Sequence, residues 1–556
     1  MKKFIFVTGG VCSSLGKGVA ASSLGALLEA RGLNVRMLKC DPYINMNAGR
    51  LSPAQHGEVY VTDDGAETDL DFGNYDRFTS GPLSKANSIT TGQVYEAVIN
   101  REKNGQYGGN TVQVIPHITN EIKSRILAVS KEYPDTDIVI IEIGGTVGDI
   151  ELIPFLETAR QLIHEQGREN ALSVHLTLVP KVGEDEQELK TKPTQHSVKA
   201  MQEWGIQPDI LICRAPTMLG EGIRRKIAQF TNVDIESIFT SYNVKTTVYQ
   251  LPRIFHDQNL DSIVLKKLGV EANQADLKDW DSVMEKYKSR KGKIRVGFVG
   301  KYVGASDAYK SIEEALFHAG LACGVKVEYE RINALKLEQE EDGVEKYLGG
   351  GGVTIDGAAQ DEASGRAVDA VLVPSSSGQS GVLGMMKAAE WARKNNVPFF
   401  GRCVGMQIMA MEWARNVIGW SDADSSEFDS ESQHFVISRL DEQTDVKIYG
   451  ESRRIGKSES SLVEGSKIYT AYGTTQIAER HRHKFEFSNK YRKDMTDSGL
   501  IISATTPDES LVDAIEWPDH PWGVGVQFDP EFTSKPNAAN PLFRDFVAAA
   551  KQRAGI

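Results

Sequence analysis

The segment at residues 4–18, which reads FIFVTGGVCSSLGKG, constrains the fold more than any other part of the sequence. A short apolar run ends in glycines, a Gly-Lys-Gly follows, and residues 19–30 continue at helical spacing. A strand, a tight turn and a helix N-terminus in this order form a cradle for phosphate, because backbone N–H groups and the helix dipole face the anion. The segment therefore predicts an α/β domain that binds a phosphate group with the help of Lys17.

The match to the P-loop pattern G-x-x-x-x-G-K-[ST] is imperfect. Five residues separate Gly10 from Gly16, and Gly18 stands where a Mg²⁺-binding hydroxyl is expected. Any metal must therefore take its protein ligands from elsewhere in the chain. Glu142 is the sharpest candidate, because a carboxylate inside an apolar strand is costly unless it binds a cation. A buried structural ion pair is the alternative interpretation.

Near-continuous apolar runs predict strands at residues 3–8, 34–39, 111–115, 137–143, 173–179 and 209–213. Strands buried on both faces indicate a parallel sheet covered by helices, and ligands bind beyond the carboxyl ends of such strands. Polar segments do follow these runs, namely KCDPY (39–43), GAETDLD (65–71), IGGTVGDIE (143–151) and KTKPTQHS (190–197). The last segment suits a second triphosphate, although a solvated loop is an equally good interpretation, and Lys226 has the same ambiguity.

The length of 556 residues exceeds what one hydrophobic core organises. A polar, charged stretch at 271–293 predicts a linker between a first domain at 1–270 and a second α/β domain at 294–556, which opens with a strand at 294–300. Residues 335–368 are acidic and then glycine-rich, which predicts a loop.

The net charge of −13 argues against a general nucleic-acid partner. No apolar run approaches the length of a membrane span, and residues 1–30 lack a signal-peptide pattern. Five scattered cysteines without a C-x-x-C pair suit a reducing compartment without structural zinc. We therefore expect a cytoplasmic enzyme.

In the second half, residues 397–407 read VPFFGRCVGMQ, with Cys403 between two glycines at a strand-to-helix junction. This pattern is typical of a nucleophile elbow, in which the helix dipole favours a thiolate. A buried, inert cysteine is the alternative. Residues 523–531 read GVGVQFDPE and place two acids just after a strand, where the partners of a catalytic triad would lie.

Together these motifs resemble the CTP synthases over nearly the whole chain. The matching segments are 4–18, 41–43, 52–58, 65–71, 112–119, 142–151, 190–197, 401–407, 425–428, 479–483 and 520–536. The resemblance implies a P-loop-type parallel-sheet synthetase domain followed by a class I glutamine amidotransferase α/β domain. In this family, ATP phosphorylates O4 of UTP and ammonia then displaces the phosphate. A Cys-His-Glu triad releases ammonia from glutamine into an internal tunnel, GTP activates, and the subunits form homotetramers.

The resemblance also assigns residues by position. Lys17 and Lys39 would neutralise the transferring phosphoryl group, and Asp71 and Glu142 would bind Mg²⁺. The ATP site would comprise Ser14, Leu15, Gly16, Lys17, Gly18, Val19, Asp71 and Val244. The UTP site, which also takes CTP as feedback inhibitor, would comprise Ser13, Asp149, Ile150, Glu151, Lys190, Thr191, Lys192, Pro193, Thr194, Gln195 and Lys226. His56 falls on the segment that lines the ammonia entrance.

The amidotransferase half departs from the family. Its glutamine pocket would comprise Ser376, Val404, Gly405, Met406, Gln407, Glu427 and Lys484. Residues 374–378 read PSSSG instead of the Pro-Gly-Gly-Phe-Gly that shapes the oxyanion hole, and residues 378–381 lack the arginine tied to GTP action. Lys484 replaces an arginine that holds the glutamine carboxylate, and lysine offers no bidentate fork. Arg402 replaces a residue that is usually apolar.

The family's triad histidine is Asp529 in this chain, whereas Cys403 and Glu531 are retained. Aspartate is a weak base at neutral pH, and its negative charge raises the pKa of a neighbouring thiol. General-base help is typically worth about 10²–10⁴-fold, so we expect weak or absent glutamine hydrolysis. The ligase would then use free ammonia or an external nitrogen donor. Another imidazole beside Cys403, such as that of His520, would overturn this expectation.

Two alternatives remain open at this point. A paralogue with the same synthetase chemistry would use another amine or another acceptor. A non-catalytic filament or regulatory subunit would have no turnover at all, although retention of Lys17, Lys39, Asp71 and Glu142 argues against it.

Overall fold

The computed structural model describes residues 2–182, 188–350, 366–376, 378–429, 431–439 and 453–556. The chain divides into two compact units. Unit 1 comprises Met1–Arg50 and Leu70–Met284, and unit 2 comprises Leu51–Asp69 and Glu285–Ile556. Residues 51–69 thus group with the second unit although both flanking segments belong to the first. The boundaries predicted at residues 270 and 294 stay predictions.

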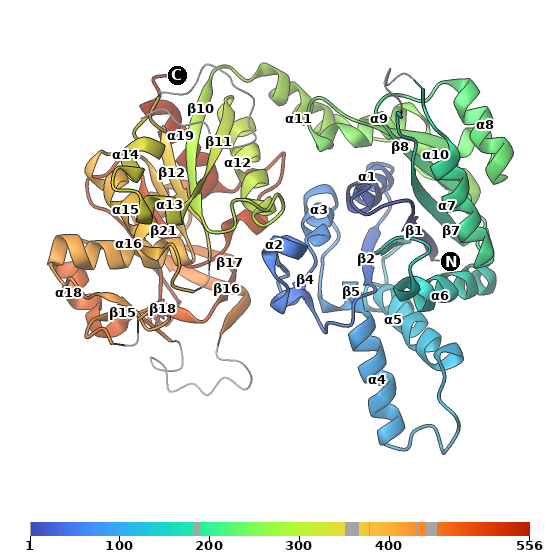
Figure 1. The fold of residues 1–556 in the computed structure, drawn as a ribbon, viewed down its shortest axis with the longest axis horizontal. Helices are drawn as coiled ribbons and strands as arrows, with labels where there is room; N and C mark the ends of the chain where they lie inside the picture. Colours follow the sequence, from blue (N-terminus) through green and yellow to red (C-terminus); the bar gives the residue numbers. More distant parts are fainter. Residues whose placement is uncertain (1, 183–187, 351–365, 377, 430, 440–452) are drawn as a thin grey trace. The chain divides into compact units, whose positions relative to one another are not determined.

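Unit 1 is built on a seven-stranded sheet in the order β5-β2-β6-β1-β7-β8-β9, and every pairing in it is parallel. The strands are β1 (Lys3–Gly9), β2 (Val35–Asp41), β5 (Ser88–Thr90), β6 (Ile138–Ile143), β7 (Ala171–Leu178), β8 (Ile210–Ala215) and β9 (Ile238–Tyr242). Nearly every strand residue is buried, because helices cover both faces (Figure 1). The predicted α/β class with a parallel sheet is confirmed.

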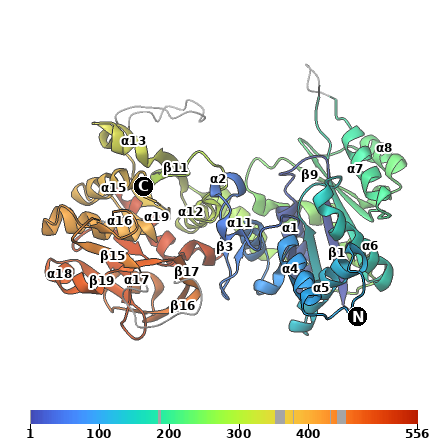
Figure 2. The ribbon, with the colours of Figure 1, turned by 60° about the horizontal axis from the view of Figure 1, so that its bottom comes forward.

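The helices of unit 1 are α1 (Lys17–Ala30), α3 (Asp71–Phe78), α4 (Thr91–Lys103), α5 (Thr119–Glu132), α6 (Ile153–Gln166), α7 (Lys192–Glu203), α8 (Glu221–Thr231), α9 (Leu251–Asp257) and α10 (Leu260–Leu268). Helices α4, α5 and α6 contribute apolar side chains to the core cluster on one side of β1, β2 and β6, whereas α1 packs against α3, α9 and α10 (Figure 2). Helix α11 (Lys278–Ser289) follows and lies within the stretch predicted as a linker.

The strand predicted at residues 111–115 is wrong. Residues Val114–Ile118 form a π-helical turn, and the Val114 and Ile115 side chains are 41% and 52% exposed. An apolar run predicts a buried strand only where a sheet covers it, and the following Pro116 lacks the N–H that a strand needs. The sheet instead ends in β5, whose three residues are too few to show a period.

Unit 2 holds a nine-stranded sheet in the order β11-β10-β12-β13-β21-β20-β19-β16-β17. The strands are β10 (Lys293–Gly300), β11 (Lys326–Asn333), β12 (Ala370–Val373), β13 (Phe399–Arg402), β16 (Arg454–Leu462), β17 (Gln476–His483), β19 (Ile501–Thr505), β20 (Val512–Glu516) and β21 (Gly523–Val526). The first five strands in spatial order pair in parallel, and the remaining pairings are antiparallel.

A small sheet of β14 (Asp424–Ser425), β15 (Phe435–Arg439) and β18 (Phe485–Phe487) and a hairpin of β3 (Tyr60–Val61) and β4 (Glu67–Thr68) complete the strands of unit 2. Its helices are α2 (Pro53–His56), α12 (Lys310–Cys323), α13 (Ala334–Gln339), α14 (Gly343–Tyr347), α15 (Val382–Lys394), α16 (Val404–Trp413), α17 (Lys467–Tyr472), α18 (Arg492–Asp497) and α19 (Pro541–Arg553). The loop predicted at 335–368 is wrong over α13 and α14, and its residues 351–365 lie outside the described part.

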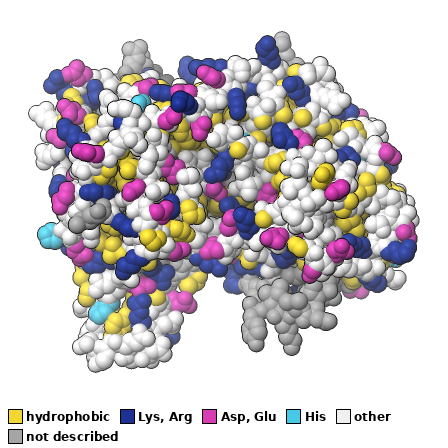
Figure 3. Space-filling view, turned by 180° about the vertical axis from the view of Figure 1, so that it is seen from behind, with side chains coloured by type: hydrophobic (Ala, Val, Ile, Leu, Met, Phe, Trp, Pro, Cys, Tyr) yellow, Lys and Arg dark blue, Asp and Glu magenta, His cyan; other side chains and the backbone are white. Residues whose placement is uncertain are grey.

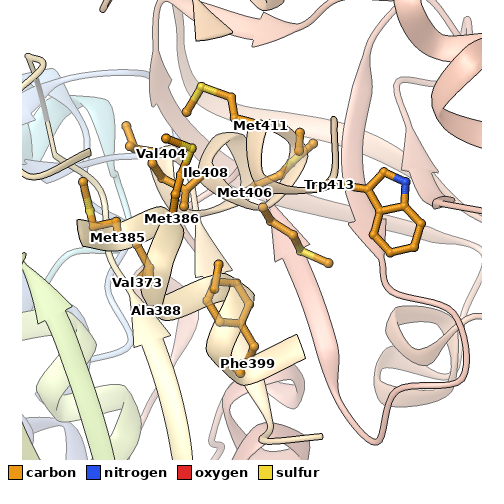
Figure 4. Packing of buried hydrophobic residues seen from close by; sticks show 14 of the residues in the cluster. Val373, Met385, Met386, Ala388, Phe399, Val404, Met406, Ile408, Met411 and Trp413 are labelled. Carbon is orange, nitrogen blue, oxygen red and sulfur yellow. The ribbon is translucent and has the colours of Figure 1, made fainter. Parts of the chain in front are cut away.

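The core of unit 2 fixes helix α16 in place. Met406 and Ile408 of α16 pack with Met385 of α15, Phe399 of β13 and other fully buried side chains (Figure 4). Burial of a side chain of this size contributes about 1.5–3 kcal/mol. The packing of these side chains therefore stabilises the junction between β13 and α16.

Cationic and anionic side chains are interspersed with apolar ones over the molecular face drawn in Figure 3. Within the described ranges, no helix is both long and apolar enough to cross a bilayer.

Candidate functional site

The turn between β1 and α1 has the backbone that a phosphate cradle requires. Val11 and Ser14 adopt φ angles of 78° and 57°, and Gly16, which precedes α1, has a φ of 84°. Two residues with side chains in the left-handed region mark a strained turn, and such strain concentrates at functional sites. Residues 11–14 are exposed, so their backbone N–H groups are accessible to an anion.

Lys39 brings carboxylates together beside this turn. Its Nζ lies 2.5 Å from Oδ2 of Asp71 and 3.0 Å from Oε1 of Glu142, and Oδ1 of Asp41 is more distant at 3.9 Å. Lys39 comes from β2, Glu142 from the adjacent β6, and Asp71 from the first turn of α3. The structure therefore places the predicted metal ligands around a single cation.

A tyrosine that the sequence analysis missed completes this cluster. The hydroxyl of Tyr75 donates to Oε2 of Glu142 at 2.5 Å, so both oxygens of the buried carboxylate are bonded. Tyr75 follows Asp71 by four residues in α3, and side chains at that spacing share one helix face. That spacing is the signal that would have revealed it.

The charges of this cluster alter one another's proton affinity. Burial raises the pKa of Glu142, the charge of Asp71 raises it further, and Lys39 opposes both effects. Burial acts to raise the pKa of Asp71 as well, but Lys39 and Lys17 outweigh it and the pKa falls below its usual value. The pKa of Lys17 is lowered by burial, against the attraction of Glu142. The cluster thus keeps an ionised Asp71 beside two lysines.

Lys17 and Gly18 sit at the start of α1, in contact with this cluster. The Nζ of Lys17 donates to the carbonyl oxygen of Gly145 at 2.8 Å. A Cβ on Gly18 would lie 2.0 Å from Oδ1 of Asp71. Gly18 therefore stands where a hydroxyl was expected because the metal-ligand candidate occupies that space.

The residues assigned to the pyrimidine nucleotide follow neighbouring strands of the same sheet. Ser13 follows β1, residues 149–151 follow β6, and Lys190 and the start of α7 follow β7, whereas Val244, which is assigned to the ATP site, follows β9 at the end of the sheet. Parallel strands end at one edge, so these segments share that edge. Lys226 differs, because it lies within α8. The binding roles of all these residues stay predictions.

The segment at residues 190–197, called the pyrimidine segment below, is partly fixed by its own side-chain hydrogen bonds. Thr194 Oγ1 lies 2.8 Å from Thr177 Oγ1, and Gln195 Nε2 donates to Thr191 Oγ1 at 3.1 Å. Lys190 pairs with Glu188 at 2.5 Å on the surface, and the side chain of Ile150 is 80% exposed.

In unit 2, Cys403 occupies the sharp turn that its flanking glycines predicted. It has φ 54° and ψ −104°, directly after β13 and before α16. A Cβ on Gly405 would lie 2.2 Å from the carbonyl oxygen of Val373, and one on Gly401 would lie 2.4 Å from that of Gly405. Both positions thus require glycine for this turn to close.

Arg402 holds both acids that follow β21. Its guanidinium forms an ion pair with Asp529 at 3.2 Å and a hydrogen bond to Glu531. The side chains of Asp529 and Glu531 are 2% and 0% exposed. Burial raises the pKa of Asp529 to about 7, with Arg402 opposing it and Glu531 adding to it. Two separate departures from the family pattern are therefore partners in space.

The thiol of Cys403 lies in surroundings that disfavour a thiolate. Burial, and then the charge of Asp529, raise its pKa to about 12, although Arg402 acts in the opposite direction. Gln527, which the sequence analysis did not single out, directs its Nε2 toward the sulfur at 3.7 Å. A thiol with this pKa is almost wholly protonated at neutral pH.

Three histidines of unit 2 contact groups other than the Cys403 thiol. His520 Nε2 lies 3.3 Å from the carbonyl oxygen of Ala392, and its ring packs edge-on against Trp517. His481 and His483 bond to each other at 3.0 Å. None of the hydrogen bonds in the described ranges joins an imidazole to Cys403 Sγ. The imidazole that would have overturned the expectation of an impaired triad is not found there.

Several of the residues predicted to form the glutamine pocket make contacts within unit 2. Glu427 accepts a hydrogen bond from the backbone N–H of Gly378 at 3.0 Å, and the charge of Lys484 acts on Glu427. Gln407 donates to the carbonyl oxygen of Phe485 at 3.0 Å. Val404, Gly405 and Met406 are buried in the first turn of α16, and Ser376 presents a buried hydroxyl that has no hydrogen-bond partner among the described residues. Their role in binding glutamine stays a prediction.

Two family models match the chain. The CTP synthase N-terminus matches residues 3–270, and glutamine amidotransferase class-I matches residues 305–549. A CTP synthase from Carboxydothermus hydrogenoformans is 50% identical over 550 residues, covering 99% of each chain, and one from Clostridium acetobutylicum is 48% identical over 551 residues, covering 99% of this chain and 98% of that one. A solved glutaminase domain of a Trypanosoma brucei CTPS with bound acivicin is 34% identical, with a TM-score of 0.41, covering 47% of this chain and 94% of that one.

Proposed function

Because the chain belongs to the CTP synthase family of C–N bond-forming ligases, we propose that it aminates UTP to CTP with free ammonia as the nitrogen donor. ATP phosphorylates O4 of UTP, ammonia attacks C4, and inorganic phosphate leaves. The products are CTP, ADP and phosphate. Ammonia replaces glutamine because, among the described residues, no imidazole bonds to Cys403 and the acid at the triad-histidine position is paired with Arg402.

The cluster of Lys17, Lys39, Asp71 and Glu142 supports the phosphoryl-transfer step. Two lysines next to a phosphate turn offset charge on the transferring group, and such preorganised electrostatics is usually the largest single contribution to catalysis. Lys17 donates to a backbone carbonyl and Lys39 pairs with carboxylates, so both are positioned before ATP binds.

The donor set of this cluster fits Mg²⁺. Asp71 and Glu142 provide hard oxygen atoms that already converge on one cation, the ammonium of Lys39. Asp71 and Glu142 would hold the ion, which when bound offsets negative charge on the ATP phosphates. Within the described residues there is no group of three or more His, Cys, Asp or Glu side chains that could hold a metal, so the remaining ligands would be phosphate oxygens and water.

The contact of Arg402 with Asp529 and Glu531 is the observation that carries the choice of ammonia. In the family pattern a histidine takes the thiol proton and a glutamate orients that histidine. Here the guanidinium of Arg402, which cannot accept a proton, contacts both acids. The charge of Asp529 also raises the pKa of the thiol. Glutamine hydrolysis therefore lacks an imidazole base among the described residues, the acid at the triad-histidine position is paired with Arg402, and the thiol is protonated at neutral pH.

The test is CTP formation and ADP release with UTP and ATP, with NH₄Cl or glutamine as the nitrogen source. We expect turnover with NH₄Cl that increases with pH as free NH₃ increases, and turnover with glutamine at least 10²-fold lower, from the loss of general-base help. Equal turnover with both donors would overturn the ammonia proposal. ADP release without CTP would point to another amine or acceptor, and absence of ADP release would favour a non-catalytic subunit.

The remaining partners follow from the family only. We extend the proposal to a homotetramer that binds ATP, UTP and CTP in a cytoplasmic setting, without nucleic-acid or membrane partners. GTP activation is left out of it, because residues 378–381 lack the arginine tied to GTP action.

A further inference from the structure

His175 is a buried histidine that the catalytic cluster does not include. It lies in β7, opposite Thr8 of the neighbouring strand β1, and its side chain is fully buried. Its Nδ1 lies 2.8 Å from Oγ1 of Thr8, and its Nε2 lies 2.7 Å from Oγ of Ser197 in α7. Both ring nitrogens are therefore engaged, which fixes the orientation of the imidazole.

This imidazole stays neutral at physiological pH. Burial lowers the pKa of His175 to about 3, and the charge of Lys17 lowers it further. A neutral ring has one N–H donor and one acceptor nitrogen, and the two hydroxyls can each take the complementary role. The contribution of His175 is thus geometric, because it carries no charge and has no proton to release near neutral pH.

The two partners of His175 belong to the two nucleotide segments. Thr8 directly precedes the glycines of the phosphate turn, and Ser197 follows Gln195 of the pyrimidine segment by two residues. The approach between them is close. A Cβ on Gly10 would lie 1.8 Å from Oγ of Ser197, and the Gly10 N–H donates to the carbonyl oxygen of Leu176 at 3.0 Å.

We propose that His175 is a positioning residue that fixes the separation between the phosphate turn after β1 and the nucleotide-binding start of α7. The inference rests on the proposed ligase function, since it takes these two segments as the ATP and UTP sites. Phosphoryl transfer to O4 of UTP requires the two substrates in line, and a misplacement of about 1 Å can lower the rate by about 10²-fold. The Thr8–His175–Ser197 chain sets that alignment from beneath the site.

The test separates the two hydrogen bonds of the ring. His175→Asn keeps a polar atom near the Nδ1 position and so keeps the bond to Thr8, whereas His175→Gln keeps one near Nε2 and so keeps the bond to Ser197. We expect Ser197→Ala and His175→Asn to lower kcat of the ammonia-driven reaction about tenfold, the equivalent of one hydrogen bond, with KM for ATP changed less than twofold. His175→Gln should stay within about threefold of the unaltered chain, because the β1–β7 ladder still holds Thr8 opposite residue 175 when the side-chain bond is lost.

A merely structural histidine would behave differently. The inference would be overturned if kcat fell in parallel with thermal stability and fell equally in His175→Asn and His175→Gln. It would also be overturned if kcat were unchanged in all variants. Thr158→Ala is the matched control, because Thr158 is a buried threonine of α6 whose hydroxyl bonds only to the carbonyl oxygen of Pro154, at 2.7 Å, among the described contacts. It should leave kcat unchanged.

A binding measurement distinguishes failure of the inference from failure of the ligase proposal. The affinity for UTP is measured by calorimetry with and without a non-hydrolysable ATP analogue. We expect the analogue to tighten UTP binding in the unaltered chain and His175→Gln, and about tenfold less in Ser197→Ala. Equal coupling in all three would overturn the positioning role even if no turnover occurred, whereas missing turnover with intact, Ser197-dependent coupling would contradict only the ligase proposal.

Discussion

Both units contain a site in which one buried cation lies among carboxylates. In unit 1 the ammonium of Lys39 contacts Asp71 and Glu142, and in unit 2 the guanidinium of Arg402 contacts Asp529 and Glu531. The sites differ in access. The Asp71 side chain is 22% exposed and lies beside an open turn, whereas the acids around Arg402 are at most 2% exposed.

The difference in access indicates that two similar sets of charges have different roles, catalysis in unit 1 and stability in unit 2. An ammonium is a compact point charge that Mg²⁺ and phosphate can displace or join, and Lys17 adds a second cation at the same place. The guanidinium of Arg402 is enclosed with two buried acids, and Arg402 Nε, Asp529 Oδ1 and Glu531 Oε2 have no hydrogen-bond partner among the described residues. We expect removal of the first cation set to abolish chemistry and removal of the second to lower stability.

The largest expected effect is on the stability of unit 2. Arg402→Leu would leave Asp529 and Glu531 buried without their partner, and breaking a buried ion pair on one side costs about 3–5 kcal/mol. A fall of roughly 10 °C in the unfolding temperature at pH 8, measured by calorimetry, would follow from that loss. The variant that also carries Asp529→Asn should recover part of it.

This loss should depend on pH in a defined direction. The pKa of Asp529 is raised to about 7, above its unfolded value of about 4, so the folded chain binds a proton that the unfolded chain releases between these values. The contribution of this group to stability therefore falls as pH rises from 4 to 7. Arg402→Leu should be closest to the unaltered chain near pH 5, and an equal loss at pH 5 and pH 8 would contradict the assignment.

The next effect is on catalysis in unit 1. Lys17→Ala should lower ammonia-driven CTP formation by about 10²–10³-fold, because it removes one preorganised cation from the phosphoryl group. Its unfolding temperature should change little, because Lys17 is only partly buried. A loss of less than tenfold would mean that this lysine is not part of the transfer site.

A smaller effect is expected from Gly18→Ala. The added methyl group would meet the Asp71 carboxylate at 2.0 Å and displace it from Lys39, so the rate should fall about 10–10²-fold with a higher requirement for Mg²⁺. Gly304→Ala is the control, because a Cβ at Gly304 meets nothing within 4 Å. An unchanged Mg²⁺ requirement in Gly18→Ala would show that Asp71 is not a ligand.

The sequence allowed prediction of each turn but not of the contacts between distant residues. The strand, turn and helix around Lys17 follow from local periodicity and glycine placement, and the turn at Cys403 follows from its two glycines. The pairing of Arg402 with Asp529 depends on β13 and β21 lying side by side, with Arg402 opposite Val526. Because β13 and β21 are parallel neighbours, the residues at their carboxyl ends lie at the same edge of the sheet. The order of strands in a sheet cannot be predicted from local sequence.

The grouping of residues 51–69 with unit 2 could not have been predicted either. Within unit 2, Arg453 forms two hydrogen bonds of 2.8 and 2.9 Å to Glu67, and Arg482 adds a third at 2.9 Å. Glu67 is separated by 386 residues from Arg453 and by 415 residues from Arg482 in the sequence. Only tertiary packing brings them together. The acidic residues at 67–71 lie in one continuous stretch of the sequence, and nothing in that stretch indicates that Glu67 and Asp71 belong to different units.

The smallest expected effect concerns the reactivity of Cys403 itself. Asp529→Asn keeps the shape of the site but removes the charge that raises the thiol pKa, and Arg402 then acts on the sulfur with less opposition. A fall of about one pKa unit would raise the thiolate fraction, and hence alkylation by iodoacetamide, about tenfold. The rate is measured by mass spectrometry relative to the exposed Cys12 in the same sample.

Asp513→Asn is the matched control, because Asp513 is an equally buried acid that pairs with Arg454 at 2.7 Å. If both variants react alike, burial alone suppresses this thiol, and the electrostatic contrast between the two units would then not extend to the sulfur.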